Sequence, residues 1–264
     1  MIQLIKFKKT KKLMRGCTTL TLALALTLNY VTVTACSQAS PELPPIPYIS
    51  YTPYTPTYSY SPFNIRVYNP WVYTTLPVTY MMLLENSEER VEEISHIVVH
   101  FISNVRGNPE NPYIISEVVQ LLLKYGASAH YIIGRDGTIY LSVPENFVAF
   151  HAGRGSLPDF PHVENRLNHY SIGIELLGIG TFEEMSVLFV SEEEYSQLDP
   201  VHIGFTEAQY TALYNLINDI LARNPAIKPN RRHIVGHDEY APNRRTDPGE
   251  LFDWNRLGFL APTD

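Results

Sequence analysis

The stretch His233–Trp254, HIVGHDEYAPNRRTDPGELFDW, organises this chain of 264 residues. It begins as a short apolar strand and continues as a loop that Pro242 and Pro248 stiffen by fixing φ. His237 and Asp247 are too far apart in sequence to share one helix face, but a stiff loop can bring them together. Imidazole and carboxylate groups are ordinary zinc ligands, and a third protein ligand would leave one position for water.

A second apolar strand offers a candidate for that third ligand. The segment Ser95–Phe101, SHIVVHF, is mostly apolar, as expected of a strand buried on both faces, and His100 lies near its end. Taken alone, a histidine such as His100 is more often a residue of the hydrophobic core. Beside His237 and Asp247 it completes a set of three zinc ligands.

Composition limits the classes of function. Hydrophobic residues make up 45% and charged residues 18% of the chain, so we expect a packed core. The net charge of −7 argues against a nucleic-acid partner, which requires a basic face. The two cysteines, Cys17 and Cys36, lie far from the candidate site in sequence, which excludes a cysteine ligand or nucleophile there and a disulfide framework.

The N-terminus has the organisation of an export signal, which we assign to residues 1–35. Six basic residues in the first fifteen precede the apolar segment Leu20–Leu28, which is too short to span a bilayer as a single helix. The sequence VTAC that ends at Cys36 resembles a bacterial lipoprotein signal, in which the cysteine is lipidated. This predicts an exported lipoprotein, anchored in a membrane and facing the cell wall. An ordinary cleaved signal or an uncleaved anchor is the alternative.

Residues 36–77 are rich in Pro and Tyr, which favours an extended polyproline II linker. A sugar-binding tyrosine surface is the alternative for this segment. We assign residues 78–264 to the catalytic domain and expect Val78–Glu93 to form a helical lead-in.

The domain alternates strands and helices. After the strand with His100 we expect a helix capped by Ser116 and stopped by Gly126, and a hairpin of strands 131–134 and 138–143. Strands 148–152 and 171–177 follow, then an acidic insertion, 178–205, with one short helix. A capping box of Thr206 and Gln209 starts the last long helix, which ends near Asn224. The pattern predicts a single α/β domain with a central mixed β-sheet flanked by helices and a zinc cleft at one end of the sheet.

Five motifs in order carry a family resemblance: VVHF, SAHYIIGRDGTIY, FHAG, NHYSIGIEL and GHDEYAPNRRTDPGELFDW. From Ile94 to Leu257 the chain resembles the zinc-dependent N-acetylmuramoyl-L-alanine amidases of the type-2 amidase family. Phage lysozyme-like amidases and peptidoglycan recognition proteins belong to the same superfamily. The resemblance implies hydrolysis of the amide bond between N-acetylmuramic acid and L-alanine in peptidoglycan or its fragments.

The resemblance also implies roles for individual residues. Zn²⁺ would be held by His100, His237 and Asp247, and Glu175 of SIGIE would be the general base. Arg245 would stabilise the oxyanion, although catalytic relatives usually have Lys at this position. An ion pair of Arg245 with a neighbouring acid, Asp238 or Glu239, is the alternative.

Three further residues match substrate-binding positions. Arg166 matches a family arginine that can hold a peptide carboxylate, and we also predict contacts from Asn168 and from His151 of the HAG motif. His151 could equally be a hydrogen-bonded scaffold residue. We expect a monomer. The alternative function is a non-catalytic peptidoglycan-binding module, but such modules typically lack part of the zinc set that this chain retains.

Overall fold

The computed structural model describes residues 71–188 and 190–258. The predicted signal peptide, the predicted lipidation site Cys36 and most of the predicted linker lie outside the described residues. Among the described helices, none is both long enough and apolar enough to cross a membrane.

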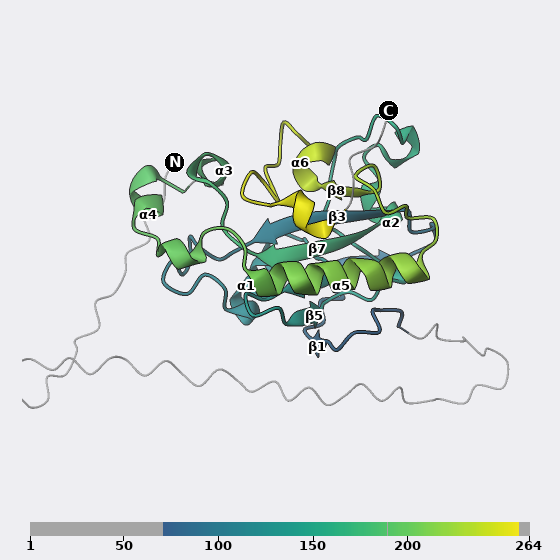
Figure 1. Cartoon of the computed structure of the whole chain (residues 1–264), viewed down its shortest axis with the longest axis horizontal. Coiled ribbons are helices and arrows are strands. Elements are labelled where there is room, and N and C mark those ends of the chain that lie inside the picture. The colour runs from purple at the N-terminus through teal and green to yellow at the C-terminus, as the bar shows by residue number, and fades with distance from the viewer. Residues whose placement is uncertain (1–70, 189, 259–264) are drawn as a thin grey trace, which may run out of the picture. The chain divides into compact units, whose positions relative to one another are not determined.

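A six-stranded mixed sheet forms the centre of the domain, with strand order β1-β5-β4-β7-β3-β8 (Figure 1). The strands are β1 Thr79–Tyr80, β3 His96–Ile102, β4 Tyr131–Ile133, β5 Ile139–Leu141, β7 Ser171–Leu177 and β8 Ile234–Gly236. The neighbours β4, β7, β3 and β8 are parallel, whereas β5 runs antiparallel to β4. A separate antiparallel pair joins β2, Ser87–Glu89, to β6, Phe147–Ala149.

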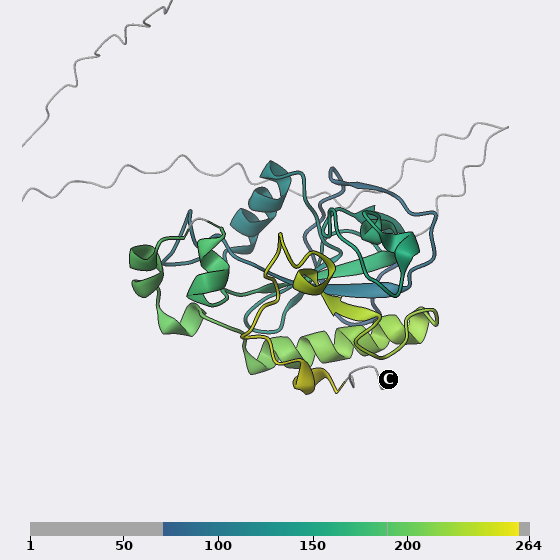
Figure 2. The ribbon, with the colours of Figure 1, turned by 90° about the horizontal axis from the view of Figure 1, so that it is seen from above.

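Two long helices cover opposite faces of the sheet, α1 Ile115–Lys124 and α5 Glu207–Arg223 (Figure 2). Four shorter helices are α2 Leu167–Tyr170, α3 Phe182–Ser186, α4 Glu192–Ser196 and α6 His237–Tyr240. Short 3₁₀ helices lie at Pro161–Val163, Pro200–His202 and Trp254–Leu257. The predicted fold class, a single α/β domain with a flanked mixed sheet, is confirmed.

Side-chain alternation along the strands decides what each face of the sheet carries. On one face, Ile97 and Val99 of β3 pack with Leu213 and Ile217 of α5 in the largest core cluster. On the other face, α1 packs against Ile132 of β4. Since successive side chains on a strand point to opposite faces, His100 and the residues that surround it lie on this second face.

Several predicted elements have their expected bounds. Strand β7 spans the predicted residues, and the hairpin of β4 and β5 is antiparallel. Helix α5 begins at the predicted capping box, in which Thr206 and Gln209 bond reciprocally, and its C-cap is Asn224. Gly126 follows the end of α1 with a φ of 64°, the left-handed conformation that terminates helices.

The predicted helical lead-in at Val78–Glu93 is wrong, because this segment contains the strands β1 and β2. The backbone of Met81 and Leu83 donates to carbonyls of Leu141 and Ser142, so the segment completes the open edge of β5. The predicted cap Ser116 is also wrong, since α1 begins at Ile115 without a side-chain cap. The acidic insertion holds two short helices, α3 and α4, each with its own capping box.

Candidate active site

Three parts of the chain bring the predicted zinc ligands together. His100 lies near the carboxyl end of β3, and His237 begins α6 directly after β8. The two strands are parallel neighbours in which Val99 pairs with Gly236, so the next residues, His100 and His237, lie side by side. Asp247 reaches them from the loop after α6, whose backbone returns through a hydrogen bond from the Asp238 amide to the Asp247 carbonyl, 2.8 Å.

Three potential ligand atoms form a compact triangle. The Nδ1 atoms of His100 and His237 are 3.0 Å apart, and Oδ2 of Asp247 is 2.7 Å from the first and 3.0 Å from the second. Within the described residues, these three side chains offer ligand atoms that lie close enough together to hold a metal ion. Tetrahedral zinc with bonds of about 2.0–2.2 Å separates its ligand atoms by roughly 3.3–3.6 Å, so a small outward movement would accommodate the ion.

The outer contacts of His237 favour the same conclusion. Its Nε2 lies 2.8 Å from the carbonyl oxygen of Ala152, which can only accept, so Nε2 donates a proton to that oxygen and Nδ1 is the nitrogen that faces Asp247. Burial lowers the pKa of His100 to about 4, so that imidazole is neutral at pH 7. Burial opposes ionisation of Asp247, but the two imidazoles beside it hold its pKa below the usual range. Two imidazoles and a carboxylate are a donor set suited to zinc.

Glu175 lies opposite His100 in the register of β3 and β7. Its side chain is 7% exposed, and within the described residues its Oε2 atom is buried without a hydrogen-bond partner. Burial raises the pKa of Glu175 well above its usual value, the charge of Asp247 raises it further, and Arg245 opposes the shift. A buried carboxyl group that lacks a partner beside a candidate metal site is a candidate for proton transfer.

Two consecutive arginines of the loop have different environments. Arg244 donates to the carbonyl oxygens of Ala152 and Arg154, 2.6 Å each, and so binds the loop to the HAG segment. Arg245 is exposed, and its charge acts on Glu175 and His100. In the described part of the chain, Glu239 pairs with Arg231 rather than with Arg245.

The predicted substrate-binding residues have partners within the protein. Asn168 accepts hydrogen bonds through Oδ1 from the backbone amides of His151 and Ala152, 3.1 and 2.7 Å. Arg166 is half-exposed and pairs with Glu92 at 3.0 Å. His151 is buried, and its ring contacts His100. The substrate contacts of all three residues stay predictions.

Sequence reasoning did not identify Arg90, which binds main-chain carbonyl groups of several segments next to this site. Its partly buried guanidinium donates to the carbonyl oxygens of Glu145, Phe147, His169 and Ser171. Burial lowers its pKa to about 10. Arg90 follows two glutamates in the sequence, so it has the pattern of a solvated charge, and only its tertiary partners show its structural role.

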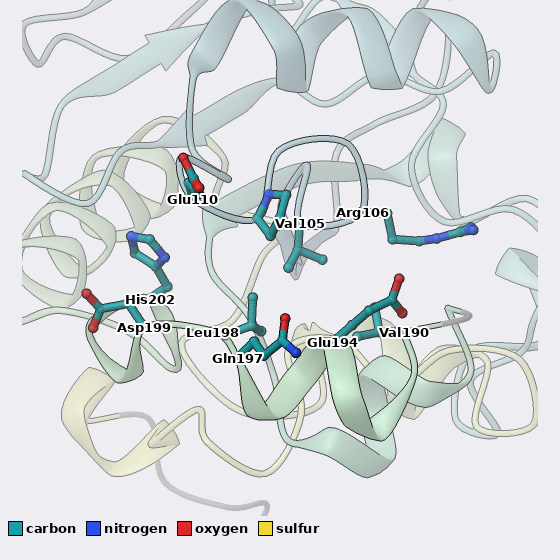
Figure 3. Close-up of a pocket in the computed structure, with 10 residues that line it drawn as sticks. Val105, Arg106, Glu110, Val190, Glu194, Gln197, Leu198, Asp199 and His202 are labelled. Carbon is teal, nitrogen blue, oxygen red and sulfur yellow. The ribbon is translucent and has the colours of Figure 1, made fainter. Parts of the chain in front are cut away.

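A separate cavity of about 480 Å³ lies between the loop after β3 and the acidic insertion (Figure 3). Its lining includes the polar and charged residues Arg106, Glu110, Glu194, Asp199 and His202 and the apolar residues Val105, Val190 and Leu198. None of the predicted site residues lines it.

Comparisons with known proteins agree with this geometry. A family model described as N-acetylmuramoyl-L-alanine amidase, Amidase_2, matches residues 90–250. The 1,6-anhydro-N-acetylmuramyl-L-alanine amidase AmpD of Salmonella typhimurium is 33% identical over 64% of this chain and 81% of its own length. AmpD of Citrobacter freundii is 38% identical over 50% of this chain, and the match spans 56% of that protein. N-acetylmuramoyl-L-alanine amidase AmiD of Escherichia coli is 37% identical over 45% of this chain and 36% of its length.

Two solved structures were also matched. A crystal structure of an Se-Met AmpD derivative has a TM-score of 0.49, with 30% identity over 69% of this chain and 92% of that chain. A complex of AmiD from E. coli with the substrate anhydro-N-acetylmuramic acid-L-Ala-D-gamma-Glu-L-Lys has a TM-score of 0.47, with 30% identity, over 64% of this chain and 58% of that chain.

Proposed function

The chain belongs to the N-acetylmuramoyl-L-alanine amidase family, and from this membership we propose how its site works. It is a peptidoglycan hydrolase that cleaves the amide bond between N-acetylmuramic acid and L-alanine. The observation that supports the catalytic role most directly is the convergence of His100, His237 and Asp247 beside Glu175. The Oε2 atom of Glu175 has no hydrogen-bond partner within the described residues.

His100, His237 and Asp247 would hold zinc, whose contribution is to acidify a water molecule and polarise the scissile carbonyl. Glu175 accepts the proton of the attacking water and delivers it to the departing amine of L-alanine. Its raised pKa suits this task, because the carboxyl group must hold the proton between the two transfers. Arg245 provides a positive charge for the oxyanion that forms at the carbonyl.

The location of the enzyme follows from the predicted export signal. We assign residues 1–35 to a lipoprotein signal, Cys36 to lipid attachment and the segment after it to a linker that precedes the catalytic domain. Three acyl chains on Cys36 would anchor the protein stably. The substrate would then be peptidoglycan or a muropeptide on the outer side of that membrane, hydrolysed by a monomer. Metabolic labelling with a fatty-acid analogue, compared between the parent chain and Cys36→Ala, tests the lipid attachment.

Digestion of purified muropeptides, followed by mass analysis, tests the activity and the metal together. We expect release of the intact stem peptide, loss of this activity with a chelator, and recovery with added zinc. Release that is insensitive to metal removal would contradict the zinc assignment. Binding of peptidoglycan without cleavage by the zinc-loaded protein would instead support the non-catalytic binding module.

A further inference from the structure

An open groove with three aromatic side chains lies at the β1 edge of the sheet, the edge opposite to β8 (Figure 1). Its volume is about 650 Å³, and all the residues that line it belong to the segment 71–80. Trp71 and Tyr80 are 40% and 54% exposed, and Tyr73 is partly buried. None of the predicted site residues lines the groove. A group of exposed large apolar side chains marks a surface that binds a partner.

Hydrogen bonds to the rest of the domain hold this segment in place. The Val72 amide donates to Oδ1 of Asn146, 2.9 Å, and the Val72 carbonyl accepts from the amide of Glu145, 2.6 Å. The Thr74 amide donates to the hydroxyl of Tyr131, 2.7 Å. Three side chains of the segment also pack on the largest core cluster: Tyr73, Leu76 and Val78. The groove is therefore preformed, and binding of a ligand would not carry the cost of ordering it.

The lining of the groove is uncharged. Among the described residues that line it, all are aromatic, aliphatic or threonine. The rings of Tyr73 and Tyr80 are perpendicular with centroids 6.0 Å apart, and their hydroxyl oxygens lie 2.9 Å apart in an exposed position. Asp219, the acid that the segment contacts through Thr75, is paired with Arg223. The groove thus presents aromatic faces beside hydroxyl groups, without a net charge.

This chemistry suits a glycan. A pyranose ring has an apolar C–H face that stacks on an aromatic ring, and hydroxyl groups at its edge that exchange hydrogen bonds with tyrosine. The stem peptide of peptidoglycan and the head groups of an anionic bilayer are charged, and they would need oppositely charged partners that this lining does not contain. A glycan strand is also the sugar part of the polymer on which an N-acetylmuramoyl-L-alanine amidase acts.

We propose that the groove of residues 71–80 is a second binding site, which holds a glycan strand of polymeric peptidoglycan. The class of ligand rests on the proposed function, whereas the groove shares no residue with the candidate active site. Four steps of about 4.8 Å separate β1 from β3 across the sheet, roughly 19 Å in all. A short muropeptide in the active site leaves the groove empty, so the groove affects only polymeric substrate.

Binding and turnover of the full chain test the proposal separately. Calorimetric titration with peptide-free glycan strands, which lack the scissile bond, measures binding. Digestion of intact sacculi and of a soluble muropeptide measures turnover. We expect Trp71→Ala and Tyr80→Ala each to weaken binding of the strands roughly 5–30-fold, the effect of removing one important aromatic contact. Turnover of dilute sacculi should fall by a similar factor, while turnover of the muropeptide stays parental. Trp71→Phe, which keeps an aromatic face, should retain most of the affinity.

Tyr125→Ala is the matched control, because Tyr125 is 68% exposed and lies outside the groove, directly after α1. It should keep parental binding and parental turnover. Parental affinity for the glycan strands in both Trp71→Ala and Tyr80→Ala would overturn the proposal. Binding to phosphatidylglycerol vesicles that depends on Trp71, without binding of the strands, would overturn it in favour of a membrane surface. A parent that binds the strands through Trp71 but cleaves no muropeptide would overturn the proposed function and support the groove, so the two failures are distinguishable.

Discussion

Glu175 has the properties of a group that acts on protons rather than on metal, since it lies beside the ligand triangle without belonging to it. Glu175→Gln keeps the shape of the side chain and removes the base. Turnover of muropeptide should fall about 10²–10⁴-fold, the usual contribution of general acid–base catalysis. Zinc content, measured by elemental analysis, should equal that of the parent. Loss of zinc in Glu175→Gln would instead assign this carboxylate to the metal.

The neighbours Arg244 and Arg245 should separate structural from catalytic effects. Arg245 has its charge near Glu175 and His100, so Arg245→Ala should lose about 10²–10³ in turnover with zinc retained. Arg245→Lys should retain much of the activity or exceed the parent, because the positive charge matters more than the shape of the side chain.

Arg244→Ala removes two hydrogen bonds to the HAG segment and should weaken zinc binding. Steady-state kinetics beside zinc titration distinguishes these outcomes, and parental turnover in Arg245→Ala would exclude a catalytic role.

His96 should make stability depend on pH. Burial lowers its pKa to about 3, with contributions from His233 and His162, whereas an unfolded histidine titrates near 6.5. As the pH falls below 6.5, His96 of the unfolded chain binds a proton, whereas His96 of the folded chain stays unprotonated. The free energy of unfolding therefore decreases between about pH 6.5 and 3, by up to about 1.4 kcal/mol per pH unit. His96→Gln should reduce this slope by about one proton, measured by urea unfolding of metal-free protein at several pH values. An unchanged slope would contradict the assignment.

At the scale of elements, sequence patterns correctly predicted those helices, turns and strands that depend on interactions between residues close together in the sequence. The capping box of α5, the turn between β4 and β5 and the alternation of β7 each act within a few residues, and each has its expected place. Residues 78–93 show the limit of such reasoning. Their apolar side chains are compatible with a helix, and the decisive factor was the open edge of β5, which is distant in sequence.

The acidic insertion is bound, through Glu184 of α3, to the loop that contains Asp247. This buried carboxylate accepts from the amide of Thr181, 2.7 Å, and from the amide of Glu250, 2.6 Å. Gly249 provides the space, because a Cβ there would lie 2.2 Å from Oε1 of Glu184. The insertion therefore fixes the segment that follows Asp247.

Glu184→Ala should lower the free energy of unfolding by about 1–3 kcal/mol for the unmet amide of Glu250, and should weaken zinc binding by loosening the loop. Urea unfolding and zinc titration measure the two effects. Glu183→Ala is the matched control, since its side chain is exposed on the same helix, and it should leave zinc affinity unchanged. Parental zinc affinity in Glu184→Ala would show that the insertion does not position Asp247.

At the scale of the whole molecule, the order of motifs predicted the family and the sheet. It also singled out His100, His237 and Asp247, which the fold brings together, and their role as zinc ligands stays a prediction. The supports around these residues were not predictable. Arg90 and Arg244 have ordinary polar patterns in the sequence, and their roles depend on carbonyl groups contributed by distant segments.

The N-terminal boundary of the domain is a further feature of the whole molecule. Residues 72–76, which the sequence assigned to the linker, bond to the domain: the Val72 carbonyl accepts from the Glu145 amide at 2.6 Å, and the Thr74 amide donates to the Tyr131 hydroxyl at 2.7 Å. Glu145 is fully buried and pairs with Arg223 of α5. These contacts lie near the β1 edge of the sheet, while the candidate metal ligands lie near β3 and β8 at the other edge (Figure 1).

A chain that begins at Val78 should therefore be less stable than one that begins at Val67. Each unmet buried hydrogen bond costs about 1–3 kcal/mol, and at least two are lost with residues 72–76. Urea unfolding of the two chains measures the difference. Tyr131→Phe in the longer chain removes the hydroxyl that accepts from Thr74, and should reproduce part of the loss without truncation. Zinc affinity should stay parental in Tyr131→Phe, because its contacts are distant from the ligands. Equal stability of the two chains would place the start of the folded domain at residue 78.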